Sequence, residues 1–150
     1  MSKDDLEAAE RFFHQKIPLT RAMGVRVLAD EAHGFAIEAP VDLNHNHLQT
    51  AFGGSINSVA TLAGYGLLWL QLRGETELVI AESSIRFLRP VRQTIRAVCM
   101  QPPASELDAF ARTLREKGKS RITLKVDVEE NGERAAEFRG TFFALANSRP

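Results

Sequence analysis

The chain has 150 residues, of which 44% are hydrophobic and 25% are charged, and this composition is typical of one ordinary globular domain spanning residues 1–150. Nineteen Lys and Arg residues balance nineteen Asp and Glu residues, so the formal net charge is zero. A neutral chain has no overall field that attracts nucleic acid or an anionic membrane, and we expect it to bind neither. The single cysteine, Cys99, excludes an internal disulfide and a zinc site built from paired cysteines, which suits a reducing cytoplasm.

The N-terminal residues predict an amphipathic helix. Ser2 can cap it, and the acidic Asp4 and Asp5 in its first turn are favoured by the positive end of the helix dipole. Its apolar residues fall on one face and are Leu6, Ala9, Phe13 and Ile17. Pro18 ends the pattern, because proline has no N–H with which to continue a helix. This segment lacks the apolar core of a signal peptide, so a cytoplasmic location is expected.

A β-hairpin and then a long apolar helix follow. Residues 24–30 and 35–41 each alternate apolar and polar side chains, which is typical of paired strands. The uncharged stretch over residues 43–72 contains the helix, which opens at Phe52 and the two glycines after it. Its apolar portion, residues 59–70, is shorter than the ~20 residues that span a membrane, so we interpret it as a buried core helix.

Four more strands are predicted after this helix, over residues 77–87, 95–100, 121–129 and 133–146. In the first of them, alternation places five side chains on one face, namely Val79, Ala81, Ser83, Ile85 and Phe87. The last two form a hairpin around Asn131-Gly132, a strong turn dipeptide, and residues 106–117 form a short helix or turn. One enclosed helix with about six strands, without regular β-α-β alternation, favours an α+β fold in which an antiparallel sheet wraps the helix.

Three segments together resemble the hotdog-fold acyl-CoA thioesterases. They are NHLQTAFGG at residues 46–54, the apolar helix that follows it, and the strand that ends IRFLRPV. The resemblance covers most of the chain and is strongest to the small thioesterase-like domain that some bacterial proteins carry fused to an acetyltransferase domain. It implies a hotdog fold and the hydrolysis of acyl-CoA or acyl-carrier-protein thioesters. Coenzyme A is then part of the substrate, and no further cofactor is required. Independently of the resemblance, no metal site is expected, because the two loop histidines lack carboxylate or thiol partners at ligand spacing.

The family pattern also shows where this chain departs from its relatives. In the pattern, an Asn is followed seven residues later by the first Gly of a His-Gly-Gly motif, and an Asp or Glu lies on the helix seven residues after the second Gly. Asn46 and Gly53 keep the first spacing. Phe52 stands at the histidine position, however, and Thr61 stands at the acid position. The usual base or nucleophile of the family therefore has no direct counterpart.

Gly53 and Gly54 suit the polarisation of a thioester carbonyl. A backbone N–H at the start of a helix is an unpaired donor at the positive end of the dipole, and the missing side chain lets the carbonyl approach. The amide of Asn46 can hold the substrate or a water molecule. The alternative interpretation is that the two glycines only permit tight packing of a turn against the sheet.

The sequence offers several candidates for the group that activates the attacking water. Thr61 cannot act as a base at neutral pH, although its hydroxyl can orient a water. His47 and, as a fallback, His45 are the only side chains near the motif of a type that titrates near neutral pH, although both are alternatively solvated loop residues. Ser83 is expected on the helix-facing side of its strand, where it can hydrogen-bond a water.

Basic residues supply a candidate site for the phosphates of coenzyme A. Arg89 lies in the IRFLRPV motif at a strand end, where the resemblance places the docked coenzyme. A second basic cluster, which is alternatively only a solvated face, contains Arg112, Arg115, Lys117, Lys119, Arg121 and Lys125.

Two other functions stay open at this stage. A hotdog dehydratase or hydratase of 3-hydroxyacyl thioesters needs a His and an acid facing each other, and Thr61 argues against that reaction. A non-catalytic acyl-binding module would keep the fold without a catalytic group. For each function we expect a homodimer, because the edge strand at residues 77–87 can pair antiparallel with its own copy. Whether dimers assemble further into a tetramer is left open.

Overall fold

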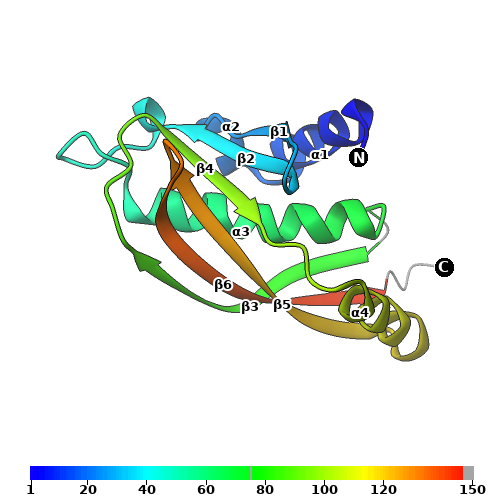
Figure 1. The fold of residues 1–150 in the computed structure, drawn as a ribbon. Helices are drawn as coiled ribbons and strands as arrows, with labels where there is room; N and C mark the ends of the chain where they lie inside the picture. Colours follow the sequence, from blue (N-terminus) through cyan, green and yellow to red (C-terminus); the bar gives the residue numbers. More distant parts are fainter. Residues whose placement is uncertain (75, 147–150) are drawn as a thin grey trace.

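The long helix α3 is wrapped by one curved antiparallel sheet (Figure 1). The structure is a computed structural model, and it describes residues 1–74 and 76–146. In chain order the elements are α1 (Lys3–Lys16), α2 (Pro18–Ala22), β1 (Arg26–Asp30), β2 (Gly34–Pro40), the 3-10 turn η1 (Val41–Leu43), α3 (Gly53–Gln71), β3 (Thr76–Phe87), β4 (Thr94–Cys99), α4 (Ala104–Lys117), β5 (Lys119–Glu130) and β6 (Glu133–Ala146).

The sheet has six strands in the order β1-β2-β4-β5-β6-β3, and every neighbouring pair is antiparallel. Within the described residues, β1 and β3 are therefore the two edges of the sheet. This arrangement confirms the predicted α+β fold with an antiparallel sheet around a long helix. It also places the IRFLRPV motif, which ends β3, at an edge of the sheet.

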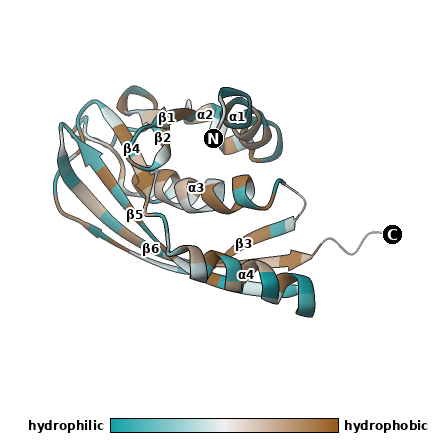
Figure 2. Ribbon diagram, turned by 45° about the vertical axis from the view of Figure 1, so that its right-hand side comes forward, coloured by the Kyte–Doolittle hydropathy of each residue, from teal (hydrophilic) through white to brown (hydrophobic). Residues whose placement is uncertain are grey.

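Helix α1 begins where the sequence predicts. The Ser2 hydroxyl accepts the N–H of Asp5 at 3.1 Å, and the Asp5 carboxylate accepts the N–H of Ser2 at 3.1 Å, which forms a capping box. Leu6, Ala9 and Phe13 of its predicted apolar face are buried, whereas Ile17 is half-buried at the C-cap position. Phe12 stacks on Trp69 of α3 with ring centroids 5.1 Å apart. In Figure 2, α1 lies on one side of α3, and the strands β3, β5 and β6 lie on the other.

Helix α3 is enclosed because its sequence leaves no polar side wide enough to face water. A β-carbon at Gly64 would lie 2.6 Å from the ring of Phe142, so the glycine allows β6 to approach the helix closely.

The hairpin that joins β5 and β6 turns at Asn131 and Gly132, which both have positive φ, at 53° and 77°. That is the geometry of the favoured two-residue hairpin turn, and it confirms the predicted turn.

Strand β3 contains a β-bulge that the sequence analysis missed. The register with β6 shifts between Ile80 and Glu82, so Ala81 has no cross-strand partner. The prediction that Val79 and Ala81 share a face with the later alternate residues is therefore wrong. The residues that pair with the buried side of β6, facing α3, are Leu78, Ile80, Ser83, Ile85 and Phe87.

Helix α4 is longer than the short helix or turn that was predicted. It buries Phe110 and Leu114 beside β5, and Gly118 ends it with a left-handed φ of 74°. Over the described residues, no helix combines the length and the apolar character that crossing a membrane requires.

Candidate active site

The loop before α3 is held in place by a buried amide. Nδ2 of Asn44 donates hydrogen bonds to the backbone carbonyls of Met23, at 2.9 Å, and Pro40, at 2.8 Å. The backbone carbonyl of Asn44 accepts the N–H of Phe52 at 2.7 Å. Because Phe52 is the residue that precedes α3, these bonds fix the position at which the helix starts.

Asn46, the first residue of the motif, closes the same loop on itself. Its Oδ1 accepts the N–H groups of Leu48, at 2.8 Å, and Thr50, at 3.2 Å, and its Nδ2 donates to the Thr50 hydroxyl at 2.9 Å. Both acceptor positions of the amide oxygen are therefore occupied, and one N–H of the amide remains for a ligand. The loop geometry accounts for an Asn at this position without any substrate contact.

The two histidines lie on this loop with exposed side chains. Residue His45 forms an isolated β-bridge with Ala51, and its Nδ1 lies 2.9 Å from the carbonyl oxygen of Asn46. A carbonyl can only accept, so Nδ1 carries a proton, and in the neutral form of the ring Nε2 has a free lone pair. No corresponding hydrogen bond orients His47 within the described residues.

The first turn of α3 presents backbone N–H groups that no side chain caps. Phe52 occupies the N-cap position without a side-chain hydrogen bond, and Gly53 and Gly54 are the first two helical residues. The next hydrogen bond, from the N–H of Ile56 to the carbonyl of Phe52 at 3.0 Å, is the first of the helical ladder. The start of α3 is thus an uncapped positive helix end.

A cavity of about 320 Å³ lies beside this helix end. Gly53 and Ile56 form one wall, the ring of Phe87 faces Gly53, and the segment after β3 forms the rest. Arg89 lies on this segment, and its guanidinium is 2.9 Å from the carboxylate of Glu133. The structure therefore brings Arg89 and Gly53 to one cavity, as expected if both contact the same ligand. Ala51, the bridge partner of His45, also lines it.

Thr61 and Asn57 lie further along the same side of α3, at successive turns after Gly53. The Thr61 hydroxyl donates to the backbone carbonyl of Asn57 at 2.8 Å, so it offers only lone pairs to a ligand. The side-chain Oδ1 of Asn57 is buried and has no hydrogen-bond partner among the described residues. A buried acceptor without a donor is costly, so a donor such as a water molecule is favoured at this oxygen.

Asn57 is the candidate that sequence reasoning missed. The sequence did contain a signal for Asn57, because it is a carboxamide in a helix whose enclosed residues are otherwise apolar. The family pattern, however, identified Thr61, one turn later, as the residue of interest. Ser83 faces α3 as expected, since it pairs with the buried Gly140, and Glu82 pairs with Thr141 on the opposite face. Because β3 is an edge strand, the Ser83 side chain is exposed in the single chain.

The family model described as "Putative thioesterase (yiiD_Cterm)" matches residues 6–146. The chain belongs to this thioesterase family. A solved structure of a Chlorobaculum tepidum protein of unknown function is similar to it, with 29% identity, a TM-score of 0.86 and 94% of each chain covered. A structure described as a "putative thioesterase" from Shewanella oneidensis has 26% identity and a TM-score of 0.84, covering 96% of this chain and 99% of that one.

A third similar structure is a Bacillus halodurans protein crystallised with CoA, with 21% identity and a TM-score of 0.67. The match covers 97% of this chain and 91% of that chain, and it establishes likeness of fold. The comparisons confirm the resemblance to hotdog thioesterases on which the sequence interpretation relied.

Proposed function

We propose that the protein hydrolyses acyl thioesters of coenzyme A or of an acyl carrier protein, with the carbonyl polarised at the start of α3. The observation that carries this proposal is the uncapped N-terminus of α3, which opens on the cavity shared by Gly53 and Arg89. Membership of a thioesterase family supports the reaction class. The CoA bound to the Bacillus halodurans protein supports CoA as the carrier.

In this mechanism the thioester oxygen accepts hydrogen bonds from the N–H groups of Gly53 and Gly54. Negative charge develops on that oxygen in the transition state, and the helix dipole stabilises it further. Water attacks the carbonyl carbon, the C–S bond breaks, and the thiolate takes up a proton. The products are a carboxylic acid and the free thiol of the carrier. Arg89 binds a phosphate of the carrier at the rim of the cavity.

Asn57 and Thr61 orient the attacking water, because both offer oxygen lone pairs and neither ionises near neutral pH. Proton removal then falls to a loop histidine. The contacts favour His45 over His47 for this role, since the hydrogen bond at Nδ1 fixes the tautomer of His45 and its bridge partner Ala51 lines the cavity. Ser83, which faces α3 across the site, is a further hydrogen-bonding group for the water.

The active form is proposed to be a homodimer that pairs two copies of β3 antiparallel. Strand β3 is an open edge, and it exposes apolar side chains that a lone chain would leave in water, including Val79, which is 55% exposed, and Phe87, which is 53% exposed. Pairing would cover this edge and close the open side of the cavity beside Phe87.

A thiol-release assay with a panel of acyl-CoA chain lengths tests the proposal. Release of free CoA supports hydrolysis, whereas consumption of an enoyl-CoA without thiol release would indicate a hydratase. The hydratase is disfavoured because Thr61 stands at the helix position where that reaction needs an acid. Binding of acyl-CoA in calorimetry without any turnover would identify an acyl-binding module instead.

A further inference from the structure

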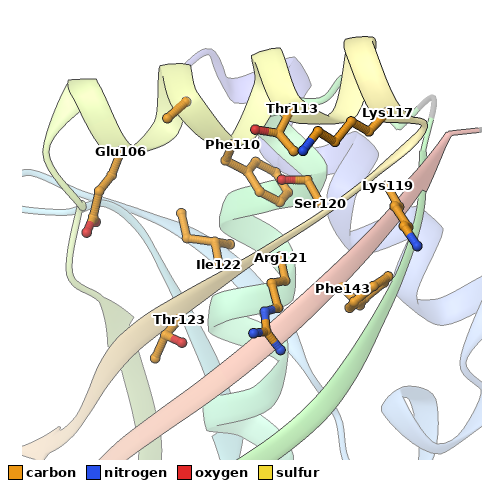
Figure 3. A pocket seen from close by; sticks show the side chains of 11 residues that line it. Glu106, Phe110, Thr113, Lys117, Lys119, Ser120, Arg121, Ile122, Thr123 and Phe143 are labelled. Carbon is orange, nitrogen blue, oxygen red and sulfur yellow. The ribbon is translucent and has the colours of Figure 1, made fainter.

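A second cavity lies between α4 and the first half of β5 (Figure 3). Strand β4 pairs with β5 only as far as Cys99 opposite Val126, so the earlier residues of β5 have α4 beside them instead of a strand. The cavity there measures about 600 Å³, and Figure 3 shows Phe110 of α4 and Phe143 of β6 lining it. None of these residues belongs to the site beside Gly53.

This cavity continues along the sheet into a further cavity of about 430 Å³. Glu106 and Thr123 line both cavities, and the two therefore form one open groove. We call it the α4 groove and define it by the five cations that line it, Lys117, Lys119, Arg121, Lys125 and Arg139.

These five cations form no ion pair within the part of the chain that the structure describes. In contrast, the neighbouring Arg134 contacts both Asp127, at 3.3 Å, and Glu137, at 2.7 Å. Among the residues that the structure describes, Glu106 is the only acidic residue lining the groove. Since the whole chain is neutral, positive charge is concentrated here rather than spread over the surface.

The cations follow a line. Lys119, Arg121 and Lys125 alternate with buried residues of β5 and therefore project from the face away from α3, and Arg139 is the cross-strand partner of Lys125. At 3.2–3.4 Å per residue, the row from Lys119 to Lys125 is about 20 Å long. The pyrophosphate of CoA needs cations that converge on one point. A row of this length instead matches a helix with acidic residues at i and i+4, which lie about 5–6 Å apart.

The proposed dimer relates this groove to the catalytic cavity. Antiparallel pairing of two β3 strands places the end of one, at Phe87, near the beginning of the other. At that beginning, Glu77 pairs with Leu145, which in turn pairs with Lys119. The groove of one copy therefore starts two strands, or roughly 10 Å, from the edge at which the cavity of the other copy opens.

We propose that the α4 groove docks an acidic, helical carrier protein whose thioester arm enters the cavity of the opposite subunit. This inference rests on the proposed function and names the carrier that the site prefers. Complementary charge along the groove supplies orientation and salt-dependent affinity, and the aromatic residues supply contact area. Nucleic acid is the less suitable polyanion, because the neutral chain provides no attraction beyond this single groove.

The test compares a groove variant with a charge-matched control. The groove variant is Arg121→Glu with Lys125→Glu, and the control is Arg11→Glu with Arg26→Glu, which changes two exposed arginines on α1 and β1 by the same charge. Binding is measured by fluorescence anisotropy with a labelled, phosphopantetheinylated acyl carrier protein that has no acyl group. We expect the groove variant to weaken binding about tenfold or more, and the control less than about twofold. Sedimentation and thermal melting establish that both variants keep the parent's fold and assembly.

Kinetics with two octanoyl thioesters complete the test. The groove variant is expected to raise KM for octanoyl-acyl carrier protein about tenfold, with kcat unchanged and KM for octanoyl-CoA changed less than about twofold. Equal increases in both KM values would assign the groove to the CoA nucleotide and overturn the proposal. A groove variant that changes the sedimentation of the protein would identify an interface between copies and overturn it too. Absence of carrier-protein binding by the parent would remove this inference while leaving octanoyl-CoA hydrolysis intact, whereas absence of hydrolysis with groove-dependent binding would remove only the proposed function.

Discussion

The ring of Phe52 lies so close over Gly54 that a β-carbon at residue 54 would be 2.6 Å from the nearest ring carbon. The family pattern has histidine at the position of Phe52. A phenyl ring in contact with Gly54 therefore stands at the start of α3, where the pattern has an imidazole. The aromatic ring is 56% exposed and still covers the backbone of the glycine. Gly54 thus has a packing role in addition to the proposed donation of its N–H.

This contact predicts that residues 52 and 54 are energetically coupled. Gly54→Ala should lower the free energy of unfolding, because the new methyl group displaces the Phe52 ring. In a Phe52→Ala background the same change should cost about 1 kcal/mol less, which is within the usual range for residues in contact. Chemical denaturation of the parent, both single variants and the double variant measures this coupling. Additive effects would mean that the ring moves away without cost.

Gly53 has room for a small side chain, since a β-carbon there would lie 3.4 Å from Phe87. Gly53→Val fills the cavity and blocks the approach of the carbonyl, so we expect a loss of turnover of about 100-fold, near the ~3 kcal/mol typical of a lost oxyanion donor. Gly53→Ala is the matched control and should retain most activity. Thiol release and thermal melting are measured together, and a Gly53→Val protein that melts far below the parent would show that the glycine is structural.

The elements that could be predicted from the sequence are those with local signals. The Ser2 cap, the Asn131-Gly132 turn and the apolar circumference of α3 each depend on a few neighbouring residues, and each is confirmed. The bulge at Ala81 could not be predicted, because it arises from pairing with β6, some sixty residues away in the chain.

In the candidate site too, local spacing could be read from the sequence, whereas features that depend on tertiary packing could not. The spacing of Asn46 and the two glycines identified the start of α3, but the spacing could not show that the Asn46 amide is engaged within its own loop. The buried oxygen of Asn57 depends on how the sheet packs against α3, and the sequence carries no direct signal for that packing.

Stability towards acid depends on Glu130, whose carboxylate accepts the N–H groups of Arg92, Gln93 and Thr94 at 2.9–3.3 Å. Partial burial alone would raise the pKa of Glu130, but these hydrogen bonds outweigh it and hold the pKa below the ordinary value of 4.5. A depressed pKa means that the carboxylate stabilises the fold above pH 4.5 and that this stabilisation is lost as the pH falls further.

Glu130→Gln should therefore lower the free energy of unfolding at pH 7, and the gap between parent and variant should narrow as the pH falls below about 4.5. Urea denaturation at several pH values measures this gap. Glu116→Gln on the exposed side of α4 is the matched control, because it makes the same substitution at an exposed carboxylate. A gap that stays constant with pH would assign the effect of Glu130 to packing rather than to charge.

The Glu130 contacts hold the segment that leads from the cavity into β4, so we also expect the variant to weaken binding of acyl-CoA.

The buried oxygen of Asn57 separates catalytic from structural interpretations. Asn57→Leu keeps the side-chain size but removes an unpartnered acceptor, so stability should be unchanged or higher. If Oδ1 orients the attacking water, kcat should fall at least about tenfold while KM stays within about twofold. Thr61→Val is the comparison and should reduce kcat less, because its hydroxyl proton already bonds the helix backbone. A stable Asn57→Leu protein with full activity would exclude Asn57 from the mechanism.

The two loop histidines are distinguished by the hydrogen bond that orients one of them. His45→Ala should lower kcat by about 10²-fold, at the lower end of what a general base contributes, and His47→Ala should lower it less. Adding Thr61→Asp to His45→Ala places a carboxylate at the family's acid position, one turn beyond Asn57, and should restore part of the rate. If both histidine variants keep full activity while Thr61→Asp raises the rate of the parent, the protein works without a dedicated base, and the polarised carbonyl at α3 with the water held by Asn57 supplies the catalysis.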